Sequence, residues 1–286
     1  MIRLASCQPA RPSATIAEAL ASYIPQRLQF ITMKDYCVRT KLQSGKPTIG
    51  CFLGLGSPHV AELLAHAGYD WLVLETEHSA VDIERVEHMM MAMEGTRANP
   101  IVRVATAEPI VIQRALDAGA MGILVPMVRT ANEVQAIVDT TRYPPVGKRG
   151  FGPLRASRYM QQGREYFREA NEKILVSLIL ETKEALDRLD EIMAVPGLDA
   201  IFVGPFDLCL SLGLDPFEQP HAEIEDALVK LVELSRRHGI AAGVGCGSPE
   251  ELQQRQDQGF TFLAYGTDYM LLEGAARRGL DAFRRV

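Results

Sequence analysis

Short apolar runs alternate with amphipathic segments along most of this chain. The runs are rich in Val, Ile and Leu and show little alternation of polar and apolar positions. Such runs are typical of strands that are buried on both faces of a parallel sheet. The predicted strands cover residues 48–53, 71–74, 100–104, 122–125, 174–180, 200–203, 240–244 and 260–264.

Each predicted strand is followed by a segment with helical spacing of its apolar residues. The predicted helices cover residues 58–67, 81–93, 109–118, 131–141, 164–171, 183–193, 222–238, 249–256 and 268–283. Eight strands, each followed by a helix, indicate an α/β protein and favour a closed (β/α)8 TIM barrel over an open doubly wound sheet.

An N-terminal extension precedes the barrel. We expect two domains, the extension at residues 1–46 and the barrel at residues 47–286. Residues 17–28 and 34–42 have helical patterns. These helices are expected either to cap the bottom of the barrel or to pack on a neighbouring subunit.

Composition narrows the classes of partner. The formal net charge is −6, which argues against nucleic acid as a main partner. No apolar run approaches about 18 residues, so no transmembrane helix and no membrane partner are expected. The five cysteines are scattered without a CxxC pair, which argues against a zinc site or disulfide framework and favours a reducing, cytoplasmic location.

Two carboxylates stand directly after successive strands. Glu181 follows the run 174–180, and Asp207 follows the run 200–203 through a Gly-Pro turn. The carboxyl ends of barrel strands meet at one mouth, so these side chains are expected to converge. A pair of carboxylates is an oxygen-only ligand set suited to a magnesium-like cation.

Other polar side chains are expected at the same mouth. Arg103 ends the third strand, and Glu75-Thr76-Glu77-His78 follows the second. The connections at the opposite end are mainly Gly, Ala, Asp and Pro, and we expect no comparable polar set there.

Each of these residues also has a structural interpretation. Glu181 and Asp207 could stabilise helix N-termini, Arg103 could be an ion-pair partner, and His78 could be a polar residue before a helix. The Gly- and Arg-rich connection 143–160 could be a surface loop or a lid over the mouth.

Taken together, the residues match one kind of chemistry. A 2-oxo acid could chelate a cation held by the two carboxylates, and Arg103 would stabilise the enolate that forms from it. His78 would transfer protons. The backbone N–H groups of Phe206 and Asp207, at a helix start, would bind the substrate carboxylate.

The sequence resembles the HpcH/HpaI family of class II, metal-dependent pyruvate aldolases from about Leu42 onward. The segments that carry the resemblance are Gly54-Leu55-Gly56-Ser57-Pro58, Asp70-Trp71-Leu72-Val73-Leu74-Glu75-Thr76-Glu77-His78, Leu124-Val125-Pro126-Met127-Val128, Thr141-Arg142-Tyr143-Pro144-Pro145, Gly147-Lys148-Arg149-Gly150, Arg155-Ala156-Ser157-Arg158-Tyr159, Glu181-Thr182-Lys183-Glu184-Ala185 and Val203-Gly204-Pro205-Phe206-Asp207-Leu208.

This resemblance implies cleavage of 4-hydroxy-2-oxo acids to pyruvate and an aldehyde, as in 4-hydroxy-2-oxoheptanedioate and 2-dehydro-3-deoxyglucarate aldolases. It implies Mg²⁺, Mn²⁺ or Co²⁺ at Glu181 and Asp207, and a homo-oligomer (hexamer or trimer) in which the C-terminal helix swaps between subunits. The implied catalytic residues are His78, Arg103 and Glu75. The implied substrate-binding residues are Arg103, Gly204, Phe206, Asp207 and Pro126.

Two departures from the family pattern leave alternatives open. Glu75 stands where the family often has an Asp that partners the histidine, and Ile179 stands where the family often has Gln. Related enolate chemistry, such as oxaloacetate decarboxylation, is one alternative. A non-catalytic family member that binds an oxo acid is the other.

Overall fold

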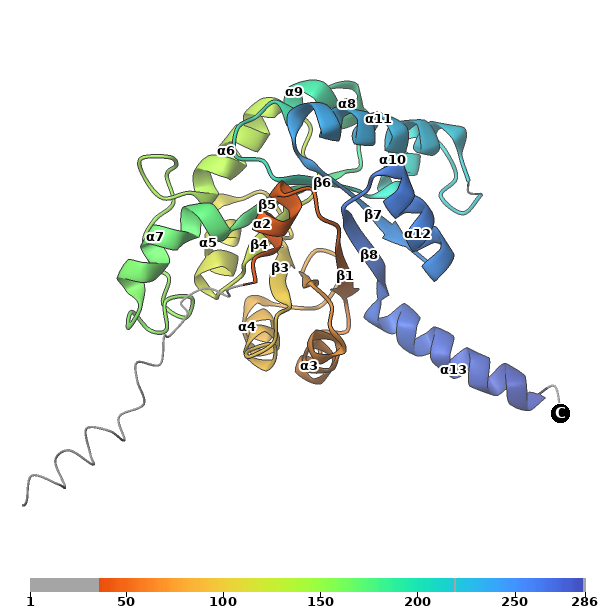
Figure 1. Cartoon of the computed structure of the whole chain (residues 1–286), viewed down its shortest axis with the longest axis horizontal. Coiled ribbons are helices and arrows are strands. Elements are labelled where there is room, and N and C mark those ends of the chain that lie inside the picture. The colour runs from red at the N-terminus through yellow and green to blue at the C-terminus, as the bar shows by residue number, and fades with distance from the viewer. Residues whose placement is uncertain (1–35, 219, 285–286) are drawn as a thin grey trace, which may run out of the picture. The chain divides into compact units, whose positions relative to one another are not determined.

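A closed barrel of eight parallel strands forms the centre of the computed structural model, which describes residues 36–218 and 220–284 (Figure 1). Each strand pairs with its neighbours in chain order, and β8 pairs with β1 to close the barrel. The strands are β1 (Thr48–Leu53), β2 (Trp71–Glu75), β3 (Asn99–Arg103), β4 (Gly122–Val125), β5 (Leu175–Leu180), β6 (Ala200–Val203), β7 (Ala241–Cys246) and β8 (Phe262–Thr267). The predicted (β/α)8 TIM barrel is therefore confirmed.

The helices follow the strands as the pattern predicts, with two local differences. The predicted helix 183–193 is two short helices that meet at Arg188. The helix start expected at Phe206 and Asp207 belongs to a separate short helix, which the predicted helix ranges do not include. The helices are α3 (Pro58–Ala67), α4 (Ile83–Ala92), α5 (Pro109–Asp117), α6 (Ala131–Thr141), α7 (Gly163–Lys173), α8 (Lys183–Asp187), α9 (Leu189–Met193), α10 (Pro205–Leu212), α11 (Ala222–His238), α12 (Pro249–Gln258) and α13 (Asp268–Arg284).

Successive side chains of each strand point to opposite faces of the sheet, so the apolar side chains form two separate cores. One set of side chains, including Leu72, Leu74 and Val102, packs in the core cluster that also contains the helix residues. The other set, including Trp71 and Val73, fills the barrel interior. Gly50 makes room for this interior, because a Cβ there would lie 2.0 Å from the Trp71 ring.

The same alternation carries polar residues to the barrel mouth. Glu75 continues the inward row of Trp71 and Val73, and Glu181 continues the inward row that contains Ile179. Arg103 is the register partner of Glu75 across the β2–β3 pair. The pleat of the sheet therefore places these three charged side chains on the inner face at one end.

Helix α2 (Val38–Gln43) closes the other end of the barrel. Its Val38 and Leu42 side chains are buried against the interior cluster. The Val38 N–H donates to the Asn99 side chain at the start of β3, at 3.0 Å. The predicted segment 34–42 is thus helical from Val38 onward and caps the bottom, whereas the predicted helix 17–28 lies outside the described residues.

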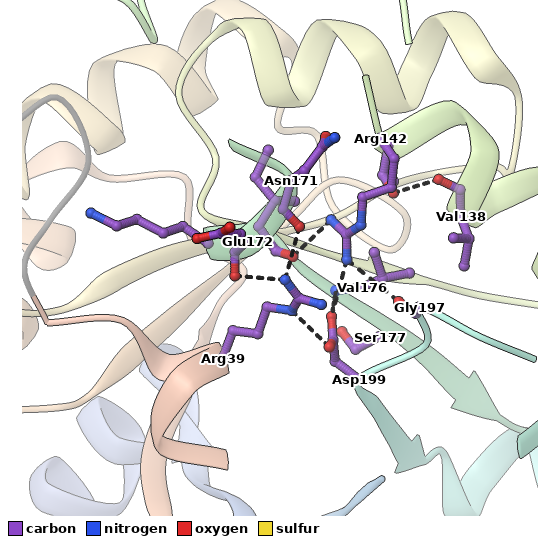
Figure 2. A network of polar contacts seen from close by, with 12 residues as sticks. Arg39, Val138, Arg142, Asn171, Glu172, Val176, Ser177, Gly197 and Asp199 are labelled. Atoms are coloured by element: carbon purple, nitrogen blue, oxygen red, sulfur yellow. Dashed lines mark hydrogen bonds and ion pairs between the residues drawn. The ribbon is translucent and has the colours of Figure 1, made fainter. Parts of the chain in front are cut away.

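The bottom of the barrel also carries a polar network, so the expectation of no comparable polar set there is wrong. Figure 2 shows Arg39 and Arg142 meeting at Asp199, which lies just before β6. The Asp199 carboxylate accepts hydrogen bonds from Arg39 Nε at 2.7 Å and Arg142 Nη2 at 3.3 Å. The sequence pattern could not reveal this set, because the arginines come from α2 and the end of α6.

A second carboxylate, Asp70, lies just before β2 and also accepts hydrogen bonds from side chains of separate segments. Its buried side chain accepts hydrogen bonds from Tyr36 at 2.6 Å, Arg97 at 2.7 Å and Lys41 at 3.1 Å. It also accepts from the Ile49 N–H at 2.9 Å. Two aspartates thus join α2 to the starts of the strands.

The connection 143–160 also lies at this bottom end. Arg142, just before it, donates to the Ile174 carbonyl at the start of β5. Arg149 donates to Asp117 at the end of α5, and Arg155 donates to the Ala118 carbonyl. Within one chain, this connection is therefore a bottom loop and not a lid over the mouth.

Among residues 36–218 and 220–284, no helix combines the length and apolar character that a bilayer crossing requires.

Candidate active site

One cavity of about 340 Å³ opens at the carboxyl ends of the strands. It brings together most of the predicted site residues. The lining residues are Phe52, Gly54, Glu75, His78, Arg103, Ile179, Glu181, Phe202, Val203, Gly204, Pro205, Phe206, Asp207, Thr267 and Tyr269. Pro126 is buried next to Met127 and is not among these lining residues.

Glu181 is the most enclosed carboxylate of the cavity, with its residue only 2% exposed. Its Oε1 accepts a hydrogen bond from the Met127 N–H, and its Oε2 lies 3.7 Å from Arg103 Nη2. Burial raises the pKa of Glu181, although the Met127 N–H and the Arg103 charge act in the opposite direction. A cation placed beside such a buried carboxylate would strongly stabilise its negative charge.

Met127 holds an uncommon backbone conformation to make this contact. Its φ is +56°, in the left-handed region that L residues other than Gly, Asn and Asp seldom adopt. Residues held in this region cluster at functional sites. Here the conformation directs an N–H group toward a carboxylate of the cavity.

Gly204 leaves the other oxygen of Glu181 open to the cavity. A Cβ at this position would lie 3.2 Å from Glu181 Oε2 and 2.9 Å from Ile179 Cγ2. Gly204 also caps α10, whose first intrahelical bond runs from the Leu208 N–H to the Gly204 carbonyl. The N–H groups of Phe206 and Asp207 precede that bond, as expected for an anion-binding helix start.

Arg103 stands among three carboxylates. Its Nη1 lies 3.3 Å from Glu75 Oε2, and its Nη2 contacts Glu77 Oε2 and approaches Glu181 Oε2. The Arg103 side chain is 12% exposed and lines the cavity. Its guanidinium is therefore fixed in place before any ligand arrives.

His78 reaches the cavity from the loop after β2, and its side chain is 61% exposed. The carboxylate next to its imidazole is Glu77, whose Oε2 lies 3.6 Å from Nε2. Glu75 instead accepts hydrogen bonds from the backbone N–H groups of Glu77 and His78, at 2.7 and 3.0 Å. The longer side chain of Glu75 thus contacts the backbone of His78 and not its ring.

Several lining residues were not predicted from the sequence. Phe52 and Phe202 form an aromatic pair with ring centroids 5.4 Å apart. Both lie on inward rows, so the alternation along β1 and β6 could have identified them. Thr267 and Tyr269 lie at the mouth because β8 ends at Thr267, which is later than the predicted end of this strand.

Asp268 holds the rim of the cavity together. This buried carboxylate at the start of α13 accepts hydrogen bonds from the Gly54 and Leu55 N–H groups, both at 3.0 Å. It therefore connects the end of β8 to the loop after β1, across the strand pair that closes the barrel.

The donor set fits a hydrated divalent cation. In the part of the chain that the structure describes, no group of three or more His, Cys, Asp and Glu side chains is arranged to hold a metal ion. Glu181 and Asp207 nevertheless supply two hard oxygen donors, which is the number Mg²⁺ commonly takes from a protein when waters and substrate complete its shell. Three carboxylates surround the Arg103 guanidinium, and Asp207 lines the same cavity, so negative charge exceeds positive charge there.

Comparisons with known proteins agree with this geometry. The family model described as HpcH/HpaI aldolase/citrate lyase matches residues 48–275. A hydroxypyruvate/pyruvate aldolase from Roseovarius nubinhibens is 38% identical over 251 residues, covering 86% of this chain and 96% of that protein. A 5-keto-4-deoxy-D-glucarate aldolase from Enterobacter sp. is 35% identical over 83% of this chain and 92% of its own length.

A solved structure shares the fold as well. The crystal structure of an HpcH/HpaI aldolase/citrate lyase family protein from Burkholderia cenocepacia has a TM-score of 0.82 and 33% identity. The match covers 86% of this chain and 98% of that one. The chain therefore belongs to the HpcH/HpaI aldolase/citrate lyase family.

Proposed function

We propose that this protein is a divalent-metal-dependent class II pyruvate aldolase. It cleaves a 4-hydroxy-2-oxo acid to pyruvate and an aldehyde and catalyses the reverse addition. The observation that carries the proposal is the single cavity where Glu181 and Asp207 lie with Arg103 and His78. The similar proteins described above are a hydroxypyruvate/pyruvate aldolase and a 5-keto-4-deoxy-D-glucarate aldolase, which supports a 2-oxo acid substrate.

Glu181 and Asp207 would hold the cation, which we propose to be Mg²⁺, Mn²⁺ or Co²⁺. Gly204 supports this role, because it leaves Glu181 Oε2 open toward the cavity. When bound, the cation supplies positive charge that polarises the 2-oxo group of the substrate.

The chain's own residues account for substrate binding and proton transfer. The N–H groups of Phe206 and Asp207 bind the substrate carboxylate at the start of α10. His78 removes the proton of the C4 hydroxyl, the C3–C4 bond breaks, and the C4 oxygen becomes the aldehyde carbonyl. The electron pair of that bond forms the C2–C3 double bond of an enolate, whose oxygen Arg103 stabilises. The proton that His78 took is then returned to C3, which gives pyruvate.

Pyruvate release tests the proposal directly. A panel of 4-hydroxy-2-oxo acids is incubated with the purified protein in Mg²⁺, Mn²⁺ or Co²⁺, and in EDTA. We expect pyruvate release with a metal and none in EDTA, with activity restored by added metal. Release that EDTA does not affect, or none across the whole panel with all three metals, contradicts the proposal.

Oxaloacetate decarboxylation is a second candidate. It forms the same pyruvate enolate by loss of CO₂ from C4 and requires no proton from a hydroxyl group. The contact of Glu75 with backbone N–H groups, and the apolar Ile179 in the cavity, favour it. The rates of aldol cleavage and of oxaloacetate decarboxylation are measured on one preparation of the wild type and on His78→Ala. The variant should lose far more of its cleavage rate than of its decarboxylation rate.

We further propose that the protein acts in the cytoplasm as a homo-oligomer, a hexamer or trimer. Its substrates are a small 2-oxo acid and an aldehyde, and neither nucleic acid nor a membrane is a partner. The buried free thiols of Cys37, Cys51 and Cys246 suit a reducing compartment. Helix α13 supports assembly, because it buries only Asp268 and exposes an apolar stripe defined by Tyr269, Leu272, Leu280 and Phe283.

A further inference from the structure

Glu77 lies between the two groups that the proposed reaction uses for charge and proton transfer. Its Oε2 contacts Arg103 Nη2 and also lies 3.6 Å from His78 Nε2. The side chain is 15% exposed, and among the described residues its Oε2 makes these ion-pair contacts and no hydrogen bond. One carboxylate oxygen thus lies beside both the guanidinium and the imidazole, although its distance of 3.6 Å from the imidazole is longer than a hydrogen bond.

Glu75 cannot take this role in the same geometry. Its Oε1 is occupied by two backbone N–H groups, and its Oε2 faces Arg103 Nη1 at 3.3 Å. The contacts of Glu75 therefore shape the loop from Thr76 to Ser79, whose Oγ also donates to the Glu75 carbonyl. This loop is what brings the Glu77 side chain back toward Arg103.

We propose that Glu77 is the positioning carboxylate of this site. It holds the Arg103 guanidinium at the cavity wall and keeps the His78 imidazole in the tautomer with a proton on Nε2. Nδ1 is then the basic nitrogen that receives the hydroxyl proton. The inference rests on the proposed aldolase function and adds a residue that the resemblance did not assign.

The surroundings of Glu77 argue against a purely structural ion pair. Burial raises the pKa of Glu77, and this effect outweighs the opposite effects of Arg103 and His78. The fold therefore gains little from the negative charge at this position. A neutral glutamine of the same shape is therefore expected to fold equally well.

The test compares Glu77→Gln and Glu77→Asp with Glu75→Gln. For Glu77→Gln we expect kcat for pyruvate release to fall about 100-fold, the scale of lost proton transfer. KM and the affinity for Mn²⁺ should stay within about threefold, and Tm should not fall. Glu77→Asp keeps the charge and should recover part of kcat. Glu75→Gln should instead lower Tm, because its carboxylate serves two backbone N–H groups.

A second readout does not depend on turnover. ¹⁵N spectra of histidine-labelled protein report which ring nitrogen carries the proton, and His78→Gln identifies the His78 signal among the six histidines. We expect the Nε2–H tautomer in the wild type and a reduced share of it in Glu77→Gln.

The outcomes separate this inference from the proposed function. If the wild type releases pyruvate and Glu77→Gln does so at a similar rate, the role of Glu77 is wrong while the aldolase proposal stands. An unchanged His78 tautomer in Glu77→Gln also overturns it. If the wild type releases no pyruvate and exchanges no methyl protons of pyruvate, the aldolase proposal itself fails, whatever the tautomer shows.

Discussion

Glu181 shows how one side chain can be prepared for a ligand by its neighbours. The Met127 N–H fixes one of its oxygens, Gly204 leaves the other open, and burial makes the bare negative charge costly. Each neighbour lies on a different segment, at the ends of β4 and β6. The metal-binding role that we propose for Glu181 therefore depends on backbone groups as much as on the carboxylate itself.

Glu181→Gln is expected to weaken cation binding by on the order of 100-fold, since a neutral amide replaces one of two carboxylate donors. Binding of Mn²⁺ is measured by calorimetry. The exposed Asp187, which pairs with Lys183 on α8, provides the matched control as Asp187→Asn. Equal Mn²⁺ affinity in the two variants contradicts the role of Glu181.

Arg103→Lys is expected to lower kcat about 100- to 1,000-fold with a small change in KM. A lysine keeps the charge but cannot face Glu75, Glu77 and the cavity at once as the planar guanidinium does. Steady-state kinetics and circular dichroism of the same samples check this. A variant that folds and retains kcat would falsify the proposed enolate stabilisation by Arg103.

At the scale of elements, the loops at the two ends of the barrel are held by buried aspartates. Asp268 holds the loop after β1 at the mouth, and Asp70 and Asp199 hold α2 at the bottom. All three accept hydrogen bonds from backbone N–H groups of neighbouring segments. Their charges thus stabilise the arrangement of elements, and the carboxylates of the cavity remain available for function.

Asp268→Asn is expected to destabilise the protein by about 2 kcal/mol, since the amide can accept fewer of the Gly54, Leu55 and Tyr269 hydrogen bonds. Gly54 lines the cavity, so KM for the 2-oxo acid should rise as well. Urea unfolding and steady-state kinetics measure the two effects. The exposed Asp281 on the same helix serves as the control, and equal effects of Asp281→Asn and Asp268→Asn contradict the prediction.

Asp70→Asn gives a prediction about pH. Burial would raise the pKa of Asp70, but hydrogen bonds from Tyr36, Ile49 and Lys41 outweigh burial and lower it below the usual 3.8. A lowered pKa means that the ionised carboxylate stabilises the fold above about pH 3.8 and that this contribution is lost as the pH falls through the lowered value. At pH 7 the variant should lose about 2–3 kcal/mol of unfolding free energy.

Urea unfolding from pH 7 down to pH 3 measures this contribution. The difference between wild type and Asp70→Asn should shrink at the acid end. Asp226→Asn, on the exposed face of α11, should show no such pH dependence. A difference that grows as the pH falls has the wrong sign and rejects the assignment.

For the whole molecule, the sequence predicted the barrel well because strand identity depends on local patterns. Buried runs such as 122–125 and 200–203 match β4 and β6 residue for residue. The inward direction of Glu75, Arg103 and Glu181 was predictable in the same way, since alternation fixes it once the strands are known.

What the sequence could not predict depends on tertiary contacts. The partner of His78 is set by the conformation of a loop, in which Glu75 bonds to the backbone and Glu77 turns to Arg103. The bottom network joins side chains from α2, α6 and the start of β6. No periodicity in the sequence marks such contacts, because their members are far apart along the chain.

The apolar stripe of α13 leads to a prediction about assembly. Leu272→Glu combined with Leu280→Glu should reduce the proposed oligomer to smaller species, since both side chains are more than half exposed in one chain. Light scattering after size exclusion gives the mass. Arg278→Glu, on the opposite face of α13, is the control, and a wild type of monomer mass contradicts the assembly proposal.

The bottom network has a consequence for the order of events during synthesis. Arg39 lies 160 residues before its partner Asp199, and Cys37 lies 136 residues before the Lys173 carbonyl that its thiol contacts. At about 5–20 residues per second, the ribosome needs on the order of 10–30 s to supply these partners. Helix α2, the earliest element described, can therefore contact Asp70 and Asn99 first and completes its contacts at the bottom only after β5 and β6 have been made.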